Sequence, residues 1–572
     1  RGRGEQQDSS HPAILNRPRP PNRGVGPPPA AVAPIQRHTA LTFLDLPWCP
    51  VTAVLPDDLR ASYPGFGGGR PPSDVELALR GRPLPADRAR SWIVTAVVTA
   101  LAAVVRLWNL GWPTDHGTPV FDEKHYVPQA WQMLRNGGYE DNYGYELVVH
   151  PPVGKQLIAI GEWLFGYNGW GWRFTAAISG IVLVLLVVRI ARRLTRSTLL
   201  GAIAGVLLIC DGVLHVQSRM GMLDIFLTVF VVAAFGCVVM DREQVRERLA
   251  EAVRKGWIGD DSYGPRLGYR WWRVGAGVLL GLACGVKWSG LYFVVAFGLL
   301  ILAMDWSARR TAGVERPLRG VLRRDLFPAV ATVGVLAVAV YVATWWAWFA
   351  SETATDRHYV EITGQGGVLA GLLPDTVRSF LAYHVNVLDF HAGLHTPEGD
   401  PHPWESKPWT WPMGLRPMLY YWGNGPEAAG CGRDECVRAT MLIGTPAMWW
   451  LAVPVLLWGL WRAVFRLDWR YAMVLTGYFA GYLPWFRDVD RQMYFFYATP
   501  MAPFLVLALT LVLGQVLGSA SAGLERRGTG LLAVSLYVGL VVANFVWLWP
   551  ILNGESITHA RWEAELWLPS WK

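Results

Sequence analysis

Two adjacent carboxylates, Asp122 and Glu123, come shortly after the first long apolar segment of the chain, at 91–110. Adjacent acids suit divided work, because one can act as a general base while the other orients it, binds a cation or contacts an acceptor. A solvated polar loop is the alternative for any acidic pair. Arg106 lies in the last turns of the apolar segment, where a cation must pair or snorkel. An acidic pair with an arginine nearby favours a chemical site at one membrane face.

A junction that contains His150 and Lys155 follows, in the order His-Pro-Pro-Val-Gly-Lys. The two prolines interrupt regular structure, and the amphipathic stretch after them predicts a helix on the outer membrane face. The junction could be purely structural. The functional alternative is a histidine and a lysine that face an anionic headgroup.

Further cations stand at the ends of apolar segments, on what we expect to be the same side of the membrane. They are Arg173, Arg219, Lys287 and Arg491. Snorkelling alone could explain any one of them. Four at one depth and side favour an anion site, for which a lipid-linked phosphate is the obvious occupant. Fixed cations would stabilise the charge that grows on a phosphate as it leaves.

Four of the histidines in the long polar stretch between 351 and 440 are candidates for a site: His384, His391, His395 and His402. The spacing of His391 and His395 would suit zinc, but the stretch is rich in Pro and Gly and lacks the His-Glu-x-x-His helix motif. We therefore predict no cofactor firmly, and a divalent metal stays possible. The Trp-rich run that includes Trp409 is expected to pack on the membrane or to shape an acceptor groove.

Two acids and two cysteines complete the set of reactive side chains. Asp211 and Asp224 are interpreted as helix caps or as partners of neighbouring basic residues. Cys431 and Cys436 flank a short polar run, so a disulfide is plausible if that loop faces an oxidising compartment. The pairing stays open from the sequence.

The elements that must position these residues are membrane helices. Of the 572 residues, 52% are hydrophobic and only 17% are charged, and many of the 31 Trp lie at the ends of apolar runs. A span needs about twenty apolar residues, which gives roughly eleven spans and an all-α polytopic membrane protein. The net charge of +8 is expected to reflect one set of loops and anionic lipid headgroups, not nucleic acid. The predicted spans are 91–110, 173–191, 197–214, 221–240, 273–287, 289–305, 326–349, 441–463, 471–486, 493–516 and 530–550.

The positive-inside rule orients these spans without reference to any site. Basic clusters at 192–193, 241–273, 319–324, 466–470 and 526–527 are placed in the cytoplasm. The segments 197–240 and 273–305 must then be hairpins. The acidic pair, the span-end cations, the loop 351–440 and the C-terminus all fall on the outer side.

Three regions follow from composition. Residues 1–88 are basic and rich in Pro and Gly, which predicts a disordered cytoplasmic tail. The tail lacks a signal peptide, so the first span is expected to be an uncleaved anchor. Residues 89–550 are expected to form a membrane domain that carries the candidate catalytic site, with outer loops at 111–172 and 350–440, and 551–572 an extracytoplasmic tail.

Taken together, the motifs resemble those of protein O-mannosyltransferases that use polyprenyl- or dolichyl-phosphate-mannose and have the GT-C fold. The resemblance extends from about Arg88 to the C-terminus. It rests on Arg106, Phe121-Asp122-Glu123, His150-Pro-Pro-x-Gly-Lys155, Arg173-x5-Ser-Gly180, Ser218-Arg-x3-Leu-Asp224, Gly285-Val-Lys-Trp-Ser-Gly290, His391-x10-His402-Pro403, Ser406-Lys-Pro-Trp409-x-Trp-Pro412 and Arg491-x3-Phe-Phe-Tyr497-x2-Pro500.

The resemblance implies an inverting single displacement, in which a Ser or Thr hydroxyl of an exported protein attacks the anomeric carbon of β-mannosyl phosphate and gives an α-O-mannosyl protein. Asp122 would be the general base, assisted by Glu123. The donor phosphate and lipid would be bound by Arg106, Arg173, Arg219, Lys287 and Arg491, and the substrates by His150, Lys155, His391, His402 and Trp409. The fold would carry interfacial helices in the first outer loop.

Eukaryotic members carry a β-trefoil in the long outer loop, and 351–440 is too short to hold one in addition to the shared motifs. The chain therefore resembles a bacterial form, in a plasma membrane, with the site on the extracytoplasmic side.

Three other functions are alternatives to this one. Another GT-C enzyme could use a polyprenyl-phosphate sugar on lipid or glycan, but the runs 406–412 and 287–290 favour the protein mannosyltransferase. A transporter or flippase usually places polar groups at the bilayer midplane and often has internal repeats. Here the charges gather at one face and no repeat is visible. A non-enzymatic scaffold would keep its function when Asp122 becomes Asn.

Overall fold

The computed structural model describes residues 71–572 except 142–148, 365–371, 398, 400, 434, 520 and 521. All of these residues belong to one compact unit that runs from Trp48 to Lys572. The predicted disordered tail lies largely outside the described residues. Its described end differs from that prediction, since it contains helix α2 (Asp74–Arg80) with a Ser73–Glu76 capping box. Leu77 and Leu79 of α2 are buried, and α2 packs against α9, so this part of the tail is ordered by burial.

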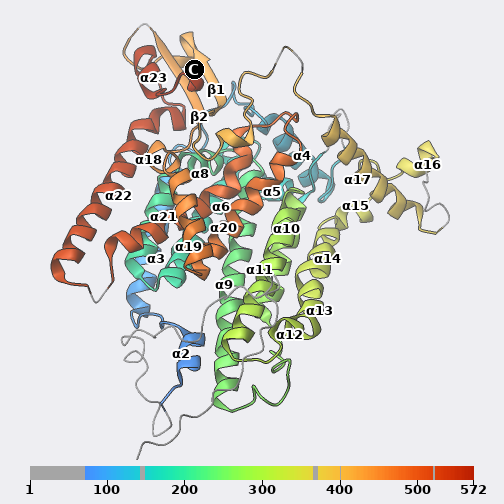
Figure 1. Cartoon of the computed structure of the whole chain (residues 1–572). Coiled ribbons are helices and arrows are strands. Elements are labelled where there is room, and N and C mark those ends of the chain that lie inside the picture. Colours follow the sequence, from blue (N-terminus) through green and yellow to red (C-terminus); the bar gives the residue numbers. More distant parts are fainter. Residues whose placement is uncertain are drawn as a thin grey trace, which may run out of the picture. The chain divides into compact units, whose positions relative to one another are not determined.

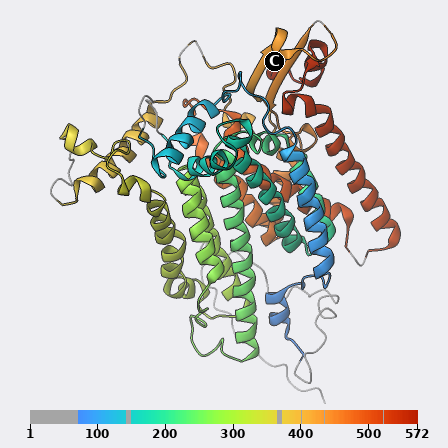
Figure 2. The same cartoon turned by 180° about the vertical axis from the view of Figure 1, so that it is seen from behind.

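Helices dominate the described chain (Figures 1 and 2). Within the described ranges, eight helical segments are long and apolar enough to cross a membrane, which makes this a multi-pass membrane protein. A helix lies in every predicted segment, but α7 and α10 are shorter apolar helices and α20 has 14 residues, so the count of eleven spans is not confirmed. The helices that lie in the predicted segments are α3 (Arg88–Leu107), α6 (Gly169–Thr195), α7 (Thr198–Ile209), α9 (Asp224–Arg254), α10 (Trp271–Val286), α11 (Gly290–Thr311), α13–η1–α14 (Leu326–Ala329, Val330–Val335, Leu336–Ala343), α18–α19 (Pro446–Trp449, Ala452–Phe465), α20 (Trp469–Tyr482), η5–α21 (Phe495–Met501, Ala502–Leu517) and α22 (Leu524–Asn553).

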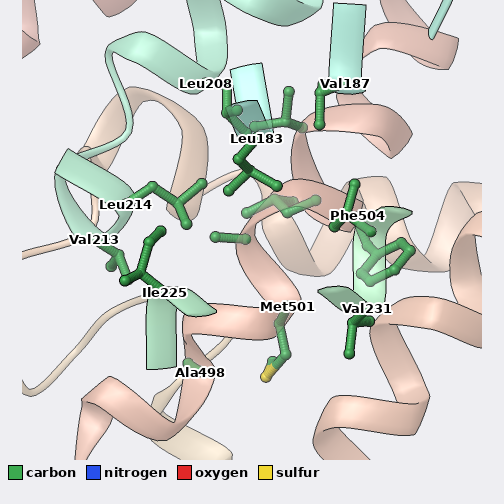
Figure 3. Packing of buried hydrophobic residues seen from close by; sticks show 14 of the residues in the cluster. Leu183, Val187, Leu208, Val213, Leu214, Ile225, Val231, Ala498, Met501 and Phe504 are labelled. Atoms are coloured by element: carbon green, nitrogen blue, oxygen red, sulfur yellow. The ribbon is translucent and has the colours of Figure 1, made fainter. Parts of the chain in front are cut away.

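The apolar core lies where α6, α7, α9 and α21 meet, and Figure 3 shows part of it. Leu183, Leu208, Ile225 and Phe504 contribute to this core from those four helices. Helices such as α3, α14 and α22 instead expose large apolar side chains on their outer faces. Exposed apolar faces of this kind are expected where lipid is the solvent.

Short helices cover one end of the bundle, which we call the site end. They are α4 (Glu123–Asn136), α5 (Val153–Phe165) and α8 (Gly212–Gln217). The amphipathic helix predicted after His150 is confirmed as α5, which packs on α4 and α6. At the opposite end lie α2 and α12 (Pro317–Arg324) (Figures 1 and 2).

The long loop 351–440 joins the C-terminal tail in a small sheet. Strands β1 (Met418–Asn424), β2 (Cys436–Leu442) and β3 (Ile557–Thr558) pair antiparallel in the order β1-β2-β3. Cys431 and Cys436 form a disulfide next to β2, which answers the question that the sequence left open. The remaining described elements of the chain are short helices and 3-10 turns, apart from the longer α17. They are α15 (Trp346–Ala350), α16 (Tyr359–Thr363), α17 (Asp375–Gly393), η2 (Pro408–Thr410), η3 (Gly425–Ala428), η4 (Leu483–Arg487), α23 (His559–Glu565) and η6 (Pro569–Trp571).

The hairpin predicted over 273–305 is confirmed, and its turn positions a charge. Helix α10 ends at Val286 and α11 begins at Gly290, which leaves Lys287 in extended backbone at the turn. A Cβ at Gly290 would lie 2.7 Å from the backbone nitrogen of Cys284. Only glycine therefore allows the turn to close this tightly, and the turn holds Lys287 at the site end.

Candidate active site

A cavity of about 1060 Å³ opens at the site end of the bundle. Its polar part combines acids, bases and cations: Asp122, His150, Asp224, Lys287, His384, His391, Arg487 and Arg491. Its apolar part runs along η1, α14 and α11, past Val330, Val335 and Val338. A polar chamber that continues into an apolar slot between membrane helices suits an amphiphile with a charged head.

Asp122 faces this cavity from the residue before α4. The preceding residue, Phe121, has φ 52°, a left-handed conformation that costs energy for a bulky side chain. Phe121 stacks on Tyr420 of β1 with ring centroids 4.3 Å apart, which holds the turn in place. Burial raises the pKa of Asp122 from 3.8 to about 6, although Lys287 and His125 oppose the rise. This carboxyl can take up or release a proton near neutral pH.

Glu123, the neighbouring acid, points away from the cavity and is fully buried. Its two carboxylate oxygens each accept a hydrogen bond of 2.7 Å from the guanidinium of Arg173. The backbone N–H of Gly221 also donates to Glu123, at 2.6 Å. The geometry therefore separates the two predicted catalytic acids, one into the cavity and one into the scaffold.

A second carboxylate, Asp224, enters the cavity from the first residue of α9. The Lys287 ammonium donates to both of its oxygens, at 3.0 and 2.8 Å. Lys287 also lies 5.6 Å from the ring centroid of Phe496. The ion pair fixes Lys287 beside Asp122, so the cavity holds two acids and at least one cation within a small volume.

Arg491 and His391 form the opposite wall. Arg491 donates to the backbone carbonyl of His391 at 2.7 Å and lies 3.3 Å from His391 Nδ1. Burial, then Arg491 and Lys287, lowers the pKa of His391 to about 4. Burial and Lys287 likewise hold the pKa of His150 well below 6.5. Both imidazoles are therefore neutral at pH 7 and can exchange hydrogen bonds with uncharged hydroxyls.

Comparison with known proteins identifies this arrangement. Residues 96–351 match the family described as dolichyl-phosphate-mannose-protein mannosyltransferase, and 376–571 match the C-terminal four TMM region of protein-O-mannosyltransferase. The chain is 60% identical over 489 residues to the polyprenol-phosphate-mannose–protein mannosyltransferase of Mycobacterium tuberculosis (strain ATCC 25618 / H37Rv), an alignment that covers 85% of this chain and 93% of the relative. The chain belongs to the protein O-mannosyltransferase family.

Two further relatives support this placement. The mannosyltransferase is 44% identical over 484 residues to the polyprenol-phosphate-mannose–protein mannosyltransferase of Corynebacterium glutamicum, which covers 83% of this chain and 93% of that one. The solved Saccharomyces cerevisiae protein O-mannosyltransferase Pmt1-Pmt2 complex bound to the sugar donor superposes with a TM-score of 0.65 at 17% identity. That match covers 88% of this chain and 94% of that chain, and it confirms the predicted GT-C fold.

Three cations predicted to bind the donor lie outside the cavity lining of the mannosyltransferase. Arg173 pairs with Glu123, as described above. Arg106 donates to His215 Nδ1 at 2.7 Å and to the carbonyls of Leu208 and Ile209 at 3.2 Å. Arg219 donates to the carbonyls of Arg106 and Asn109, at 3.0 and 3.2 Å. All three are buried and connect the end of α3 to neighbouring elements.

The remaining predicted residues also lie apart from the cavity. Lys155 is fully buried in an ion pair with Glu140. His402 stacks edge-on against Tyr494, with ring centroids 5.3 Å apart, and Trp409 is 59% exposed. Within the described part of the chain, no group of three or more His, Cys, Asp or Glu side chains could hold a metal.

Sequence reasoning undervalued two cavity residues. Asp224 was interpreted as a cap or surface partner, although an acid on the first turn of an apolar run needs a cation, here Lys287. His384 was named only as a loop histidine. It stacks on Trp288 with ring centroids 5.4 Å apart and lies 2.6 Å from the Tyr341 hydroxyl. These contacts could not be seen in the sequence, because α17 and the α10–α11 turn are about a hundred residues apart.

Proposed function

We propose that this protein transfers mannose from polyprenyl-phosphate-mannose to Ser and Thr hydroxyls of exported proteins. The observation that carries the proposal is Asp122, a partly buried carboxyl with its pKa raised to about 6, in a cavity that also holds cations and an apolar slot. The slot would bind the isoprenoid chain of the donor, and the cations would bind its phosphate. The names of the relatives support this donor and a protein acceptor.

The proposed reaction is an inverting single displacement. The acceptor hydroxyl gives its proton to Asp122 while its oxygen forms a bond to the anomeric carbon of mannose. The bond between that carbon and the phosphate oxygen breaks, and its electron pair leaves with the polyprenyl phosphate. A base with a pKa near 6 is ionised at neutral pH and yet basic enough to take the proton as the new bond forms.

The cations of the cavity would stabilise the leaving phosphate. Lys287 and Arg491 both line the cavity. Their charge opposes the negative charge that develops on the phosphate, and a site shielded from water strengthens this effect. Asp224 would position Lys287 through the two hydrogen bonds described above.

The buried residues keep a role in this proposal, as positioning residues. Glu123 and Arg173 would fix the turn that presents Asp122, and Arg106 and Arg219 would hold the end of α3 from which that turn departs. Lys155 would anchor α5 through Glu140.

The sugar and the acceptor need uncharged contacts. The neutral imidazoles of His150 and His391 are suited to mannose hydroxyls. His402 and Trp409 stay predictions for the acceptor side. We place the site on the extracytoplasmic side of a plasma membrane, a placement supported by the positive-inside bias and by the Cys431–Cys436 disulfide in the long loop.

The test is transfer by purified full-length protein. It would be incubated with polyprenyl-phosphomannose and a peptide rich in Ser, Thr and Pro, with and without EDTA. We expect mannosylated peptide that an α-mannosidase can digest, because inversion of a β-linked donor gives an α linkage. Transfer to lipid but not to peptide would contradict the acceptor assignment, and a β-linked product would contradict the single displacement. Loss of mannosyl transfer in the presence of EDTA would show that the reaction needs a metal ion.

A further inference from the structure

A second large cavity, of about 1200 Å³, lies between α11, α19 and α20. We call it the α11–α20 groove. Most of its lining is aliphatic or aromatic, including Leu299, Leu475 and Phe479. Three arginines, Arg242, Arg246 and Arg310, also line it, whereas none of its lining residues is a carboxylate. The proposed transfer reaction does not use this groove.

The arginines lie at the opposite end of the bundle from the site. Helix α9 runs from Asp224 in the site cavity to Arg242 in the groove, and eighteen residues of α-helix rise about 27 Å. The hydrocarbon core of a bilayer is about 30 Å thick. Arg242 and Arg246 therefore lie at the level of the headgroups on the far side of the membrane from Asp122.

The groove extends along almost the whole of α11. Its lining includes Leu291 and Tyr292 in the first turn of α11 and Arg310 and Thr311 at the end. Leu291 and Tyr292 also line the site cavity. A molecule in the groove would thus have an apolar body along α11, a charged head at the arginines, and contact with the wall of the site.

Arg242 is held open for an anion. Its guanidinium lies 3.4 Å from the ring centroid of Trp469. Among the described residues it forms no ion pair with a carboxylate, because the nearby acids have other partners. Asp241 pairs with Arg270, and Glu243 pairs with Arg193 and Arg196. Arg246 donates to two carbonyls of α2, which fixes it beside the same end of the groove.

We propose that the α11–α20 groove binds an anionic glycerophospholipid from the leaflet opposite the site. Arginine suits a phosphate headgroup, and basic residues at this level attract anionic lipids. Trp306 and Trp469, which both line the groove, provide aromatic surface at headgroup depth. The sugar donor does not fit this description, because its phosphate must lie near Asp122, about 27 Å away along α9. The exclusion of the sugar donor rests on the proposed function, whereas the apolar lining and the arginines of the groove do not depend on it.

The test is photolabelling of the full chain purified in detergent. Phosphatidylglycerol and phosphatidylcholine, each with the same diazirine-bearing acyl chain, would be crosslinked in parallel and the sites mapped by peptide mass spectrometry. We expect phosphatidylglycerol to label α11 and α20 in preference to phosphatidylcholine. Arg242→Gln should lower that preference about fivefold, and adding Arg310→Gln should lower it further by a similar factor.

Two variants make the result specific. Arg189→Gln is the matched control, because Arg189 also stacks on a tryptophan, at 4.0 Å from the ring centroid of Trp92, but does not line the groove. It should leave labelling unchanged. Ala303→Trp fills the groove without removing a charge, and it should reduce labelling by both lipids even if the Arg242 variant folds poorly.

Three outcomes would overturn the proposal. Equal labelling by the two lipids, or labelling that Arg242→Gln leaves unchanged, would mean that bulk lipid fills the groove. Displacement of phosphatidylglycerol by an equimolar amount of polyprenyl phosphate would assign the groove to an isoprenoid. Crosslinks between two copies of the chain through α11 or α20, with no lipid label, would assign it to a protein interface.

Discussion

The site cavity and the buried layer behind it contain the same kinds of residue, yet use them differently. In the cavity, Lys287 and Arg491 both line the open volume where an anion can bind, although Lys287 is also paired with Asp224 and Arg491 donates to the His391 carbonyl. In the layer behind, Arg106, Arg173 and Arg219 are enclosed by backbone carbonyls, a histidine and one carboxylate. A cation's depth in the membrane therefore does not decide its role. Its surroundings do, because a guanidinium that is enclosed by protein groups cannot reach a ligand in the cavity.

The adjacent acids repeat the contrast on a smaller scale. Asp122 is partly buried, no cation among the described residues is in hydrogen-bond contact with it, and its pKa is raised. Glu123 is buried in a bidentate ion pair with Arg173. One side chain is kept reactive and its neighbour is kept rigid, which is the arrangement expected when a strained turn must hold a base in place.

The largest effect should come from the cavity acid. Asp122→Asn keeps the size of the side chain and removes the base, so we expect kcat/KM for mannosyl transfer to fall by about 10²–10⁴-fold. The variant should unfold at the same temperature as the parent or higher, since an amide avoids the cost of burying a charge. Transfer at the parental rate would show that Asp122 is not the base.

The adjacent scaffold acid should respond in the opposite way. Glu123→Gln leaves Arg173 as an uncompensated buried charge, which typically costs about 3–5 kcal/mol of unfolding free energy. Thermal unfolding in detergent would measure the loss, with Asp122→Asn as the matched acid-to-amide control. If the Glu123→Gln protein kept parental stability but had low activity, Glu123 would take part in the reaction. The proposed difference between Asp122 and Glu123 would then be wrong.

A pair of arginine variants probes the same contrast among the cations. Removal of a charged hydrogen-bond partner costs about 1.5–3 kcal/mol, so Arg491→Gln should weaken donor binding by roughly 10- to 100-fold. Arg219→Gln should lower the unfolding temperature and leave the affinity of the folded protein for the donor within a few-fold. Titration with a non-hydrolysable polyprenyl phosphate would measure the affinity of both variants, and thermal unfolding would measure their stability. Similar losses of donor affinity in the two variants would place Arg219 at the phosphate.

The smallest effect is a pH dependence. Asp122 must be ionised to act as a base, so with a pKa of about 6 the transfer rate should fall about tenfold per pH unit below 6. His391, with its pKa lowered to about 4, stays neutral over this range.

Acid unfolding would not explain that loss. The folded protein binds the Asp122 proton more tightly than the unfolded chain does, so this group stabilises the fold below about pH 4 and loses that contribution as the pH rises to about 6. Unfolding temperatures at pH 5 and pH 7 provide the check. A rate that is flat from pH 5 to pH 7 would contradict the raised pKa.

Much of this arrangement was predictable from local patterns. Apolar runs of spanning length gave the membrane helices, and the turn at Lys287 followed from basic residues at both ends of 273–305. The motifs around Asp122, His150 and Arg491 identified one end of the bundle as the site. The helical end of the tail, the short α20 and the sheet that joins β2 to β3 were not predictable in this way. Each depends on contacts between segments far apart in the chain.

The sequence by itself determined which residues can do chemistry and brought them to one end of the bundle, because hydropathy and charge bias act on each segment separately. Only the tertiary structure decided which of them share a cavity. Asp122 and Glu123 are neighbours in sequence, and Arg219 and Lys287 both stand at span ends. Their roles diverge because a buried charge is available or committed according to the groups that packing places within hydrogen-bond reach, and those groups come from distant helices.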